Sequence, residues 1–336
     1  MTRAFSSEVD TGSRTENASK QESGAPFRFH RNGNGSRLPQ IALLPDGKRL
    51  HLQDGPIDLI IEAKGRDADV SVAYQAAAAR FTGLLDELCA ELAELRSAAA
   101  PGGCTLKGVV ARRMHAAVAP FAADGFITPM AAVAGSVAEE ILGAMLEAAA
   151  LDRAYVNNGG DIALHLSDGE QFTVGLMDRP DRHGVMRTMT VDADTPVRGI
   201  ATSGRHGRSF SLGIADAVTV LARTASQADA AATVIANAVD LPDHPAILRV
   251  PASELQPDSD LGARLVTRDV GRLAEREIEH ALEAGAVRAR DLLMSGLIEG
   301  AALRLLGETR IVGATGMSAP ASHALQGQTT EHMLRA

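Results

Sequence analysis

The sequence predicts an α+β fold in which mixed β-sheets are covered by helices. Two observations favour this class. Apolar runs of strand length, such as residues 57–63 and 217–222, follow one another between turn residues, whereas several longer stretches repeat apolar residues at helical spacing. Because the strands do not alternate one by one with helices, a doubly wound parallel sheet is not predicted.

The composition is that of a globular protein with a small-residue core. Of the 336 residues, 45% are hydrophobic, only 3% are aromatic and none is Trp. The formal net charge is -9, and both this charge and the lack of aromatic residues argue against nucleic-acid binding. Cys89 and Cys104 are too few for a disulfide framework and lack the paired spacing of a zinc site, so we expect a reducing cytoplasm.

The chain is expected to contain one main domain between two tails. Residues 1–37 are rich in Ser, Gly, Asn and charge and have no apolar segment of a secretory signal, which predicts a disordered tail. Residues 38–312 are expected to form a single α+β domain, with two lobes as an alternative, and residues 313–336 a flexible tail. Since no uninterrupted apolar run reaches about 18 residues, membrane insertion is not predicted.

The first part of this domain predicts a hairpin, a strand and a helix. Residues 40–44 and 48–52 flank the turn Pro45-Asp46-Gly47, which is typical of a β-hairpin, and residues 57–63 follow as a third strand. Residues 68–96 predict one long helix whose leucines recur at three- and four-residue steps and cover the sheet. These leucines are Leu84, Leu85, Leu88, Leu92 and Leu95.

The middle of the chain predicts a linker at residues 98–103 and a strand-like or mixed stretch up to residue 126. Ser136 is followed three residues later by Glu139, which is a capping-box pattern and predicts that a helix begins at Ser136. Residues 153–166 predict one strand that contains a glycine bulge or a close backbone approach.

The second half predicts more strands than helices. A strand is expected at residues 171–177, followed by a polar loop at 178–184. Further strands are expected at 186–191, 197–201, 217–222, 246–250 and 300–312. Helices are expected at 227–239 and 274–286, with a less regular stretch at 289–296.

Chemistry-bearing residues gather in three small-residue tracts. In the first, Asn157-Asn-Gly-Gly-Asp161, the glycines Gly159 and Gly160 allow a planar ring or a sugar to approach the backbone, and Asn157 and Asn158 offer amide donors and acceptors. The alternative is a glycine bulge whose asparagines satisfy the neighbouring backbone.

The second tract runs from Thr202 to Ser209. Its glycines tolerate positive φ, and Arg205 and Arg208 are fork-shaped donors suited to a pyrophosphate. The alternative is an exposed loop with solvated arginines. His206 is a candidate acid or base, although the sequence identifies no nucleophile or orienting acid for a triad.

In the third tract, Asp229 and Thr233 lie four residues apart on a predicted helix and share one face. A carboxylate and a hydroxyl are hard oxygen ligands that suit Mg²⁺ or Ca²⁺. The alternative is that Asp229 belongs to a helix-capping pattern that begins at Ser226, where the helix dipole favours an acid. The sequence contains no Rossmann, P-loop or zincin motif.

Together the tracts resemble the signature of the ApbE-like superfamily, in which the founding members are flavin transferases that cleave FAD and attach FMN to a threonine of a target protein. More closely, the sequence resembles an uncharacterised ApbE-like family, over roughly residues 39–312. Besides the three tracts, the matching stretches are residues 50–61, 126–135 and 257–262.

The resemblance implies a site for Mg²⁺ and for FAD or FMN. It implies that Asp229 and Thr233 hold the magnesium ion. Asp229 and, from its residue type alone, His206 are the catalytic candidates. The remaining candidates contact the flavin nucleotide: Asn158, Gly159, Gly160 and Asp161 against the nucleotide, Thr202, Ser203 and Gly204 beside its phosphates or ribityl chain, and Arg205 and Arg208 on its charge.

Two features depart from the transferases. Their His-Ile-x-Asp-Pro-x-x-Gly segment is missing, and residues 211–216 fill the interval before the next strand. Their Lys-Gly-x-Ala-x-Asp helix start corresponds to residues 135–139, which contain no lysine and in which Glu139, or the adjacent Glu140, stands in for the acid.

Three functions therefore stay open. The first is a metal-dependent transferase or hydrolase that processes a flavin, in the manner of an FMN transferase or an FAD pyrophosphatase. The second is a flavin-binding protein that is redox-active or non-catalytic. The third is an enzyme for a small acidic metabolite, bound at Arg205, His206 and Arg208. Alanine-rich helices also leave a homo-oligomer open.

Overall fold

The computed structural model describes residues 39–177, 185–313, 317–318 and 333–335. The predicted N-terminal tail, the predicted loop at residues 178–184 and nearly all of the predicted C-terminal tail lie outside these residues.

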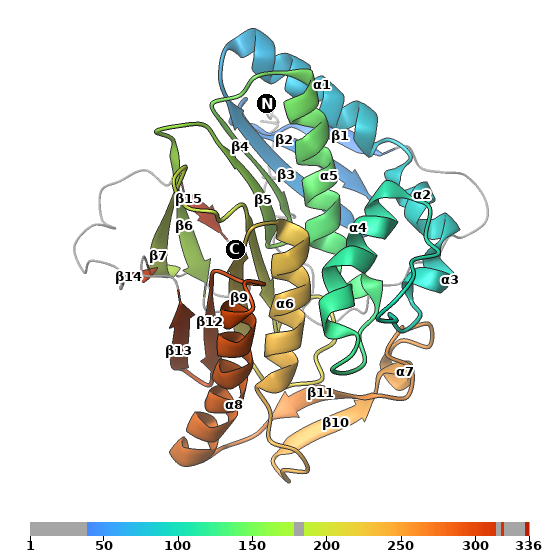
Figure 1. The fold of residues 1–336 in the computed structure, drawn as a ribbon, viewed down its shortest axis with the longest axis vertical. Coiled ribbons are helices and arrows are strands. Elements are labelled where there is room, and N and C mark those ends of the chain that lie inside the picture. The colour runs from blue at the N-terminus through green and yellow to red at the C-terminus, as the bar shows by residue number, and fades with distance from the viewer. Residues whose placement is uncertain (1–38, 178–184, 314–316, 319–332, 336) are drawn as a thin grey trace, which may run out of the picture.

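A large antiparallel sheet organises the fold (Figure 1). Within the described residues it has nine strands in the order β1-β2-β3-β4-β5-β8-β9-β12-β13, and each neighbouring pair is antiparallel. The strands are β1 (Gln40–Leu43), β2 (Leu50–Asp54), β3 (Ile57–Lys64), β4 (Arg153–Asn158), β5 (Asp161–Leu166), β8 (Gly199–Ser203), β9 (Ala217–Ala222), β12 (Gly300–Leu305) and β13 (Glu308–Gly313).

Two smaller sheets accompany it. One contains, in the described part of the chain, β14 (Met317–Ser318), β7 (Val185–Asp192), β6 (Gln171–Met177) and β15 (Met333–Arg335), with β15 parallel to β6. The other pairs β10 (Ile247–Pro251) with β11 (Leu265–Val270). The small sheet that contains β6 and β7 is therefore the mixed one.

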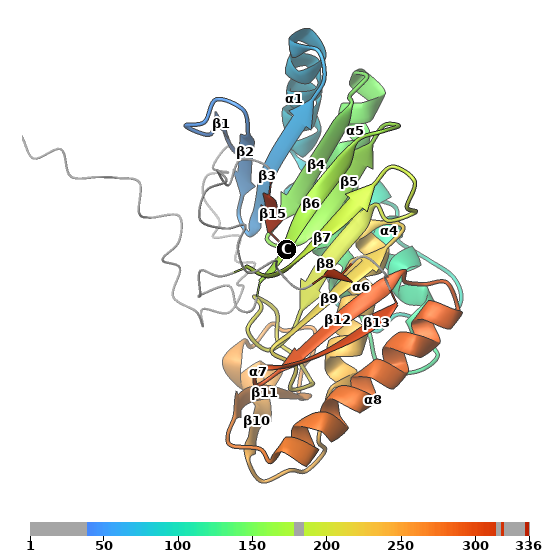
Figure 2. The same ribbon diagram turned by 90° about the vertical axis from the view of Figure 1, so that its left-hand side faces the viewer.

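Helices cover one face of the large sheet, and the β6-β7 sheet covers the opposite face (Figures 1 and 2). The helices are α1 (Asp67–Phe81), α2 (Leu84–Ala90), α3 (Leu92–Leu95), α4 (Val109–Val118), η1 (Ala119–Phe121), η2 (Pro129–Ala132), α5 (Val133–Ala148), α6 (Ala225–Ala238), α7 (Ala252–Leu255) and α8 (Glu275–Met294).

The alternation of side chains along each strand divides the core between these layers. Val156 of β4 and Val220 of β9 are buried under the helices, whereas Ile162 of β5 and Ile200 of β8 are buried against Phe172 of the small sheet. Many helix residues in the core are alanines, so the helices approach the sheet closely, as expected from a composition poor in aromatic residues.

The stretch Pro129–Ala148, which joins η2 and α5, is long and apolar enough to cross a membrane by length and composition. Half of that stretch is buried within the protein, and α5 packs on β4, β5 and α6. Among the described residues it is the one such stretch, and the same signal is typical of the core helix of a globular domain.

The predicted α+β class is confirmed, and so are several elements. The hairpin of β1 and β2, the strand β3 and the strand β9 lie where the sequence predicts them, with β9 matching at both ends. Of the five leucines predicted to form a stripe, Leu84, Leu88 and Leu95 are buried, whereas Leu85 and Leu92 are half-buried.

The prediction of one long helix over residues 68–96 is wrong. The helix ends at Phe81 because Thr82 is extended and Gly83 has a φ of 85°, and Glu91 divides the remainder into α2 and α3. The strand-like prediction before residue 126 is also wrong, because α4 forms there and buries Val110 and Met114.

Three further boundaries differ from the prediction. Residues 153–166 form two antiparallel strands, and Gly159-Gly160 is the turn between them rather than a bulge. Ser136 is buried inside α5 and does not cap it, because the helix begins at Val133. The less regular stretch at residues 289–296 is mostly the last part of α8, which continues to Met294.

The closest contact between helices predicts a stability difference between two glycines of α5. A Cβ atom on Gly135 would lie 2.3 Å from the carbonyl oxygen of Ala225, whereas a Cβ on Gly143 would meet no atom within 4 Å. We expect Gly135→Ala to lower the free energy of unfolding by about 2–3 kcal/mol through overpacking. As the matched control, Gly143→Ala should raise it by about 0.5–1 kcal/mol through helix propensity. Urea denaturation measures both; equal effects would contradict the role of the contact.

Candidate functional site

The candidate site lies where the first turns of α5 and α6 cross beside the sheet. Gly135 of α5 contacts Ala225, the first residue of α6, and a Cβ on Gly199 of β8 would lie 2.1 Å from the carbonyl oxygen of Thr224. Three backbone segments therefore approach without intervening side chains. This close approach places the first turns of both helices next to the turn between β4 and β5.

Asp229 joins the two helices. Its Oδ2 accepts a hydrogen bond from the Gly135 N–H at 3.0 Å, and the Ala134 N–H stabilises the same carboxylate. The capping interpretation of Asp229 is wrong, because the N-cap of α6 is Thr224, whose hydroxyl accepts from the Gln227 N–H at 3.3 Å. Asp229 instead lies further along the helix, with its carboxylate directed at α5.

Asp161 approaches the same point from the sheet. It is the first residue of β5, directly after Gly159-Gly160, and its Oδ1 accepts from the Thr202 N–H of β8 at 3.2 Å. Burial raises the pKa of Asp161 to about 7, although the Thr202 amide and the Arg208 charge act in the opposite direction.

The two carboxylates repel each other. Burial raises the pKa of Asp229 well above its usual range, and the neighbouring charge of Asp161 raises it further. Glu139 adds a third negative charge, while its Oε1 accepts from the Ser226 N–H at 2.6 Å. A divalent cation is the partner that would relieve such repulsion.

The donor set fits a hard metal ion in part. Asp161 and Asp229 supply carboxylate oxygens, and Thr233, one turn after Asp229, supplies a hydroxyl on the same side of α6. Within the residues that the structure describes, no group of three or more His, Cys, Asp or Glu side chains is arranged to hold a metal ion. Such an ion would need hydroxyl, carbonyl, water or ligand oxygens as well, as is usual for Mg²⁺.

Arg208 lies directly on the β4-β5 turn. A Cβ atom on Gly159, which has a φ of 66°, would be 1.6 Å from Nη2 of Arg208, so only glycine leaves room for the guanidinium. A Cβ on Gly160 would meet no atom within 4 Å, and its N–H donates to Oδ1 of Asn157 at 2.8 Å. The close backbone approach predicted at these glycines is thus made by an arginine side chain.

Arg205 and His206 point elsewhere. Nε and Nη2 of Arg205 lie 2.9 and 2.6 Å from Oδ1 of Asp216, and Nε2 of His206 lies 3.2 Å from the same oxygen. Asp216, which both residues contact, is buried, with its side chain 8% exposed. Of the three loop residues expected at the ligand, Arg208 is the one that the structure brings to Asp161.

The remaining candidates surround this point. The Asn158 amide is buried and donates to the Ala134 carbonyl at 3.2 Å, which ties β4 to α5. The Thr202 hydroxyl contacts Thr219 at 2.8 Å, Ser203 ends β8, and Gly204 follows with a φ of 147°. Asn158, Thr202 and Gly204 therefore have roles in building the fold besides any role in binding.

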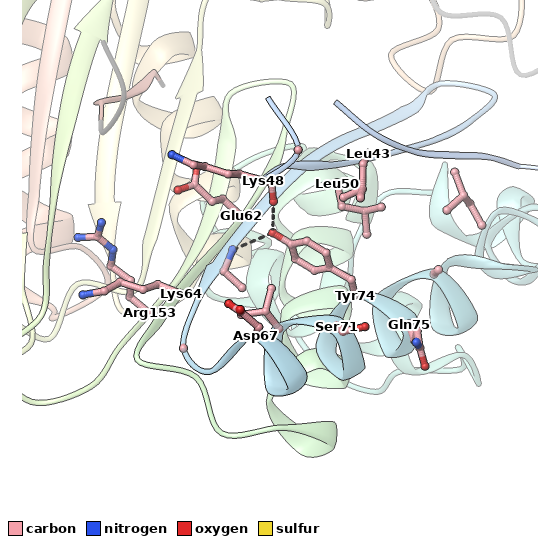
Figure 3. A pocket seen from close by; sticks show the side chains of 16 residues that line it. Leu43, Lys48, Leu50, Glu62, Lys64, Asp67, Ser71, Tyr74, Gln75 and Arg153 are labelled. Atoms are coloured by element: carbon pink, nitrogen blue, oxygen red, sulfur yellow. Dashed lines mark hydrogen bonds between the residues drawn. The ribbon is translucent and has the colours of Figure 1, made fainter. Parts of the chain in front are cut away.

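A separate cavity of about 670 Å³ lies at the other end of the sheet, between the first strands and α1 (Figure 3). Its central side chain is Tyr74, whose hydroxyl donates to the Lys48 carbonyl at 2.6 Å and accepts from the Ala63 N–H at 3.1 Å. Burial raises the pKa of Tyr74 to about 12. None of the candidate residues lines this cavity.

Two residues of the site carry signals that sequence reasoning used only in part or missed. Glu139 appears in the sequence as a helix-capping acid, but its carboxylate bridges the Ser226 amide and Nε of Arg113, the latter at 3.2 Å. Asp216 has no motif around it. Its one signal is an acid placed directly before a buried apolar strand, opposite a loop that contains two arginines.

The fold and this crossing of helices define the chain as an α+β protein with an acidic site beside a glycine turn. Comparison with known families then identifies the family of the chain. The model of the family described as AbpE bacteria matches residues 41–311, so the chain belongs to this ApbE-like family.

Relatives among curated archaeal proteins carry the name UPF0280 protein. The chain is 40% identical over 147 residues to one from Methanothrix thermoacetophila, which covers 43% of the chain and 58% of the relative. It is 38% identical over 135 residues to one from Methanopyrus kandleri, covering 40% and 51%. These alignments span about half the length of each relative, and the relatives' name states no activity.

The paired carboxylates predict a pH dependence of stability in the metal-free protein. The pKa of Asp161 is about 7 in the folded state and 3.8 in a free side chain, so the folded state binds the additional proton between these values. Relative to Asp161→Asn, the unmodified protein should lose stability as the pH rises from about 4 to about 7. Urea denaturation in the presence of a chelator, at intervals across this range, measures the difference.

The control for this experiment is Asp69→Asn, which alters a carboxylate that is paired with Arg66 at the start of α1. We expect the stability of this variant to follow the same pH dependence as that of the unmodified protein across the upper part of the range. If Asp161→Asn has the same pH profile as the unmodified protein, Asp161 does not hold the additional proton.

Proposed function

We propose that this site binds a phosphorylated ligand, a flavin nucleotide, together with a divalent cation of the Mg²⁺ type. The observation that carries the proposal is the convergence of Asp161 and Asp229 from two different elements, close enough for one carboxylate to raise the pKa of the other. Half-buried carboxylates that repel each other are costly to the fold, and a bound cation would offset that cost.

Asp229, Asp161 and Thr233 would hold the cation, and when bound it would supply a Lewis acid for a phosphoryl oxygen. The side chains around the cation would bind the ligand. Arg208 lies beside Asp161 and has the fork of donors that matches a phosphate. Its guanidinium contacts Gly159, two residues before Asp161 in the chain.

The glycine turn supports a ligand with a flat or sugar-like part. Gly159 and Gly160 present backbone without side chains, and space remains open where a Cβ on Gly160 would lie. The resemblance of the tracts to the ApbE-like flavin transferases supports FAD or FMN as that ligand. On this proposal the partner is a small molecule in the cytoplasm, with no nucleic acid and no membrane insertion.

A second candidate is binding of the flavin without cleavage. The observation that favours it concerns His206, the residue expected to act as acid or base. Its Nε2 lies 3.2 Å from Asp216 rather than beside Asp161 or Asp229. With His206 at Asp216, a transferase or pyrophosphatase reaction would depend on the cation and on Arg208.

The proposal predicts cation-dependent binding of flavin nucleotides. Titration of FAD or FMN, followed by flavin fluorescence, should give binding with Mg²⁺ that weakens with a chelator. Asp229→Asn keeps the size of the side chain but removes its charge, and we expect it to weaken Mg²⁺-dependent binding by at least about tenfold, the scale seen when metal sites lose a supporting group. Release of AMP from FAD, measured by chromatography, separates processing from binding.

The matched control is Asp69→Asn, which removes a carboxylate paired with Arg66 on α1 and should leave flavin binding unchanged. Binding of both nucleotides without AMP release would support the second candidate. Absence of any binding in saturating Mg²⁺ would overturn the proposed function and leave the small acidic metabolite as the ligand to test.

A further inference from the structure

Asp216 is the most heavily hydrogen-bonded carboxylate near the site, and no role in ligand binding accounts for it. It lies directly before β9, with its side chain 8% exposed. Its Oδ1 contacts Arg205 and His206, and its Oδ2 accepts from the Leu306 N–H at 2.5 Å. Burial alone would raise the pKa of Asp216, but these donors lower it, so the group is held as a carboxylate.

The main chain around Asp216 is fixed as well. Its N–H donates to the Arg304 carbonyl at 2.9 Å, which joins it to β12. The Arg205 N–H donates to the Ala215 carbonyl at 2.9 Å, and a Cβ on Gly204 would lie 2.7 Å from the Asp216 carbonyl. The loop that begins at Gly204 is therefore wrapped tightly around this one position.

The wrapped loop leads directly to Arg208. The Gly207 N–H donates to the Gly204 carbonyl at 3.0 Å, which closes a turn, and Arg208 follows that turn. Arg208 is itself exposed, yet its guanidinium lies on Gly159 and its charge acts on Asp161. An exposed arginine loses rotamer entropy when it holds one orientation, so the loop must contribute part of the constraint.

We propose that Asp216 is a positioning residue that acts through Arg208. By binding Arg205 and His206 on one carboxylate, it closes the turn at residues 204–207 and sets the direction in which Arg208 leaves it. Within this loop, Arg205 and His206 therefore hold the backbone in place, and Arg208 faces the phosphate. The role of Arg208 toward a phosphate rests on the proposed function, whereas the role of Asp216 in the geometry of the loop does not.

A purely structural role for Asp216 makes a different prediction. If its contact with Leu306 merely stabilises the β12-β13 turn, then replacing Asp216 lowers stability without changing the order of Arg208. Asp216→Asn distinguishes the two roles, because the amide keeps the size of the side chain and an acceptor for Leu306 but loses the charge that holds Arg205 and His206.

The first measurement needs no ligand. In ¹⁵N NMR of arginine-labelled protein, with the Arg208 signal assigned by its loss in Arg208→Lys, we expect an ordered Nε–H group in the unmodified protein. Asp216→Asn should lower its order parameter to below about 0.6, the range of flexible groups. Asp58→Asn should leave it unchanged. An ordered Arg208 in Asp216→Asn would overturn the proposal even if the protein is less stable.

The second measurement uses FMN with Mg²⁺ as the probe. Arg208→Ala and Asp216→Asn should each weaken binding by about tenfold, as expected for a lost charge-assisted contact. Combined in one chain, they should weaken it no more than Arg208→Ala alone, since coupled residues are not additive. Additive losses would show that Asp216 acts by another route and would overturn the proposal.

Two outcomes keep the test separate from the proposed function. If FMN does not bind to the unmodified protein, the proposed function fails, and the order of Arg208 still decides the role of Asp216. If Asp216→Asn does not fold, Arg205→Gln breaks the same ion pair from the other side and should have the same effect on Arg208. An unchanged Arg208 in that variant would contradict the inference.

Discussion

The close crossing of α5 and α6 is the constraint on which the site depends. Gly135 brings the backbone of one helix against Ala225 of the other, and Gly199 brings β8 against the residue that caps α6. Any side chain at these glycines would separate the segments. Because the first turns of both helices meet, their free N–H groups converge on a small volume, and such groups favour negative charge. The sequence places Asp229 and Glu139 there, and both accept hydrogen bonds from backbone amides of the opposing helix.

The electrostatics of the site follow from this packing. Amide donors and one arginine stabilise the acids in part, but burial and mutual repulsion outweigh them, as the raised pKa values of Asp161 and Asp229 indicate. A protein that needed only structural ties between helices would gain by replacing one of the acids with an amide, since the hydrogen bonds could remain without the repulsion. The presence of two half-buried carboxylates at one point is therefore the physical basis of the proposed cation site.

The sequence predicted the parts of the fold that carry their own pattern. The strand β9 is a short, buried apolar run, and its two ends follow from its composition. The break at Gly83 and the helix α4 lie among alanines and leucines, where spacing does not separate a helix from a strand or a continuous helix from a broken one. Of the site, Gly159, Gly160 and Asp229 were singled out from residue type and spacing, although the two glycines were expected inside one strand and form a turn. Asp216 was not, because its partners come from the preceding loop and from a turn 90 residues later along the chain.

The two halves of the site are constrained by different physics. The acidic half is fixed by backbone contacts at glycines, where almost no substitution fits. The loop half is fixed by the ion pair of Arg205 with Asp216 and by the contact of His206 with the same oxygen, and another set of side chains could make such contacts with a different loop.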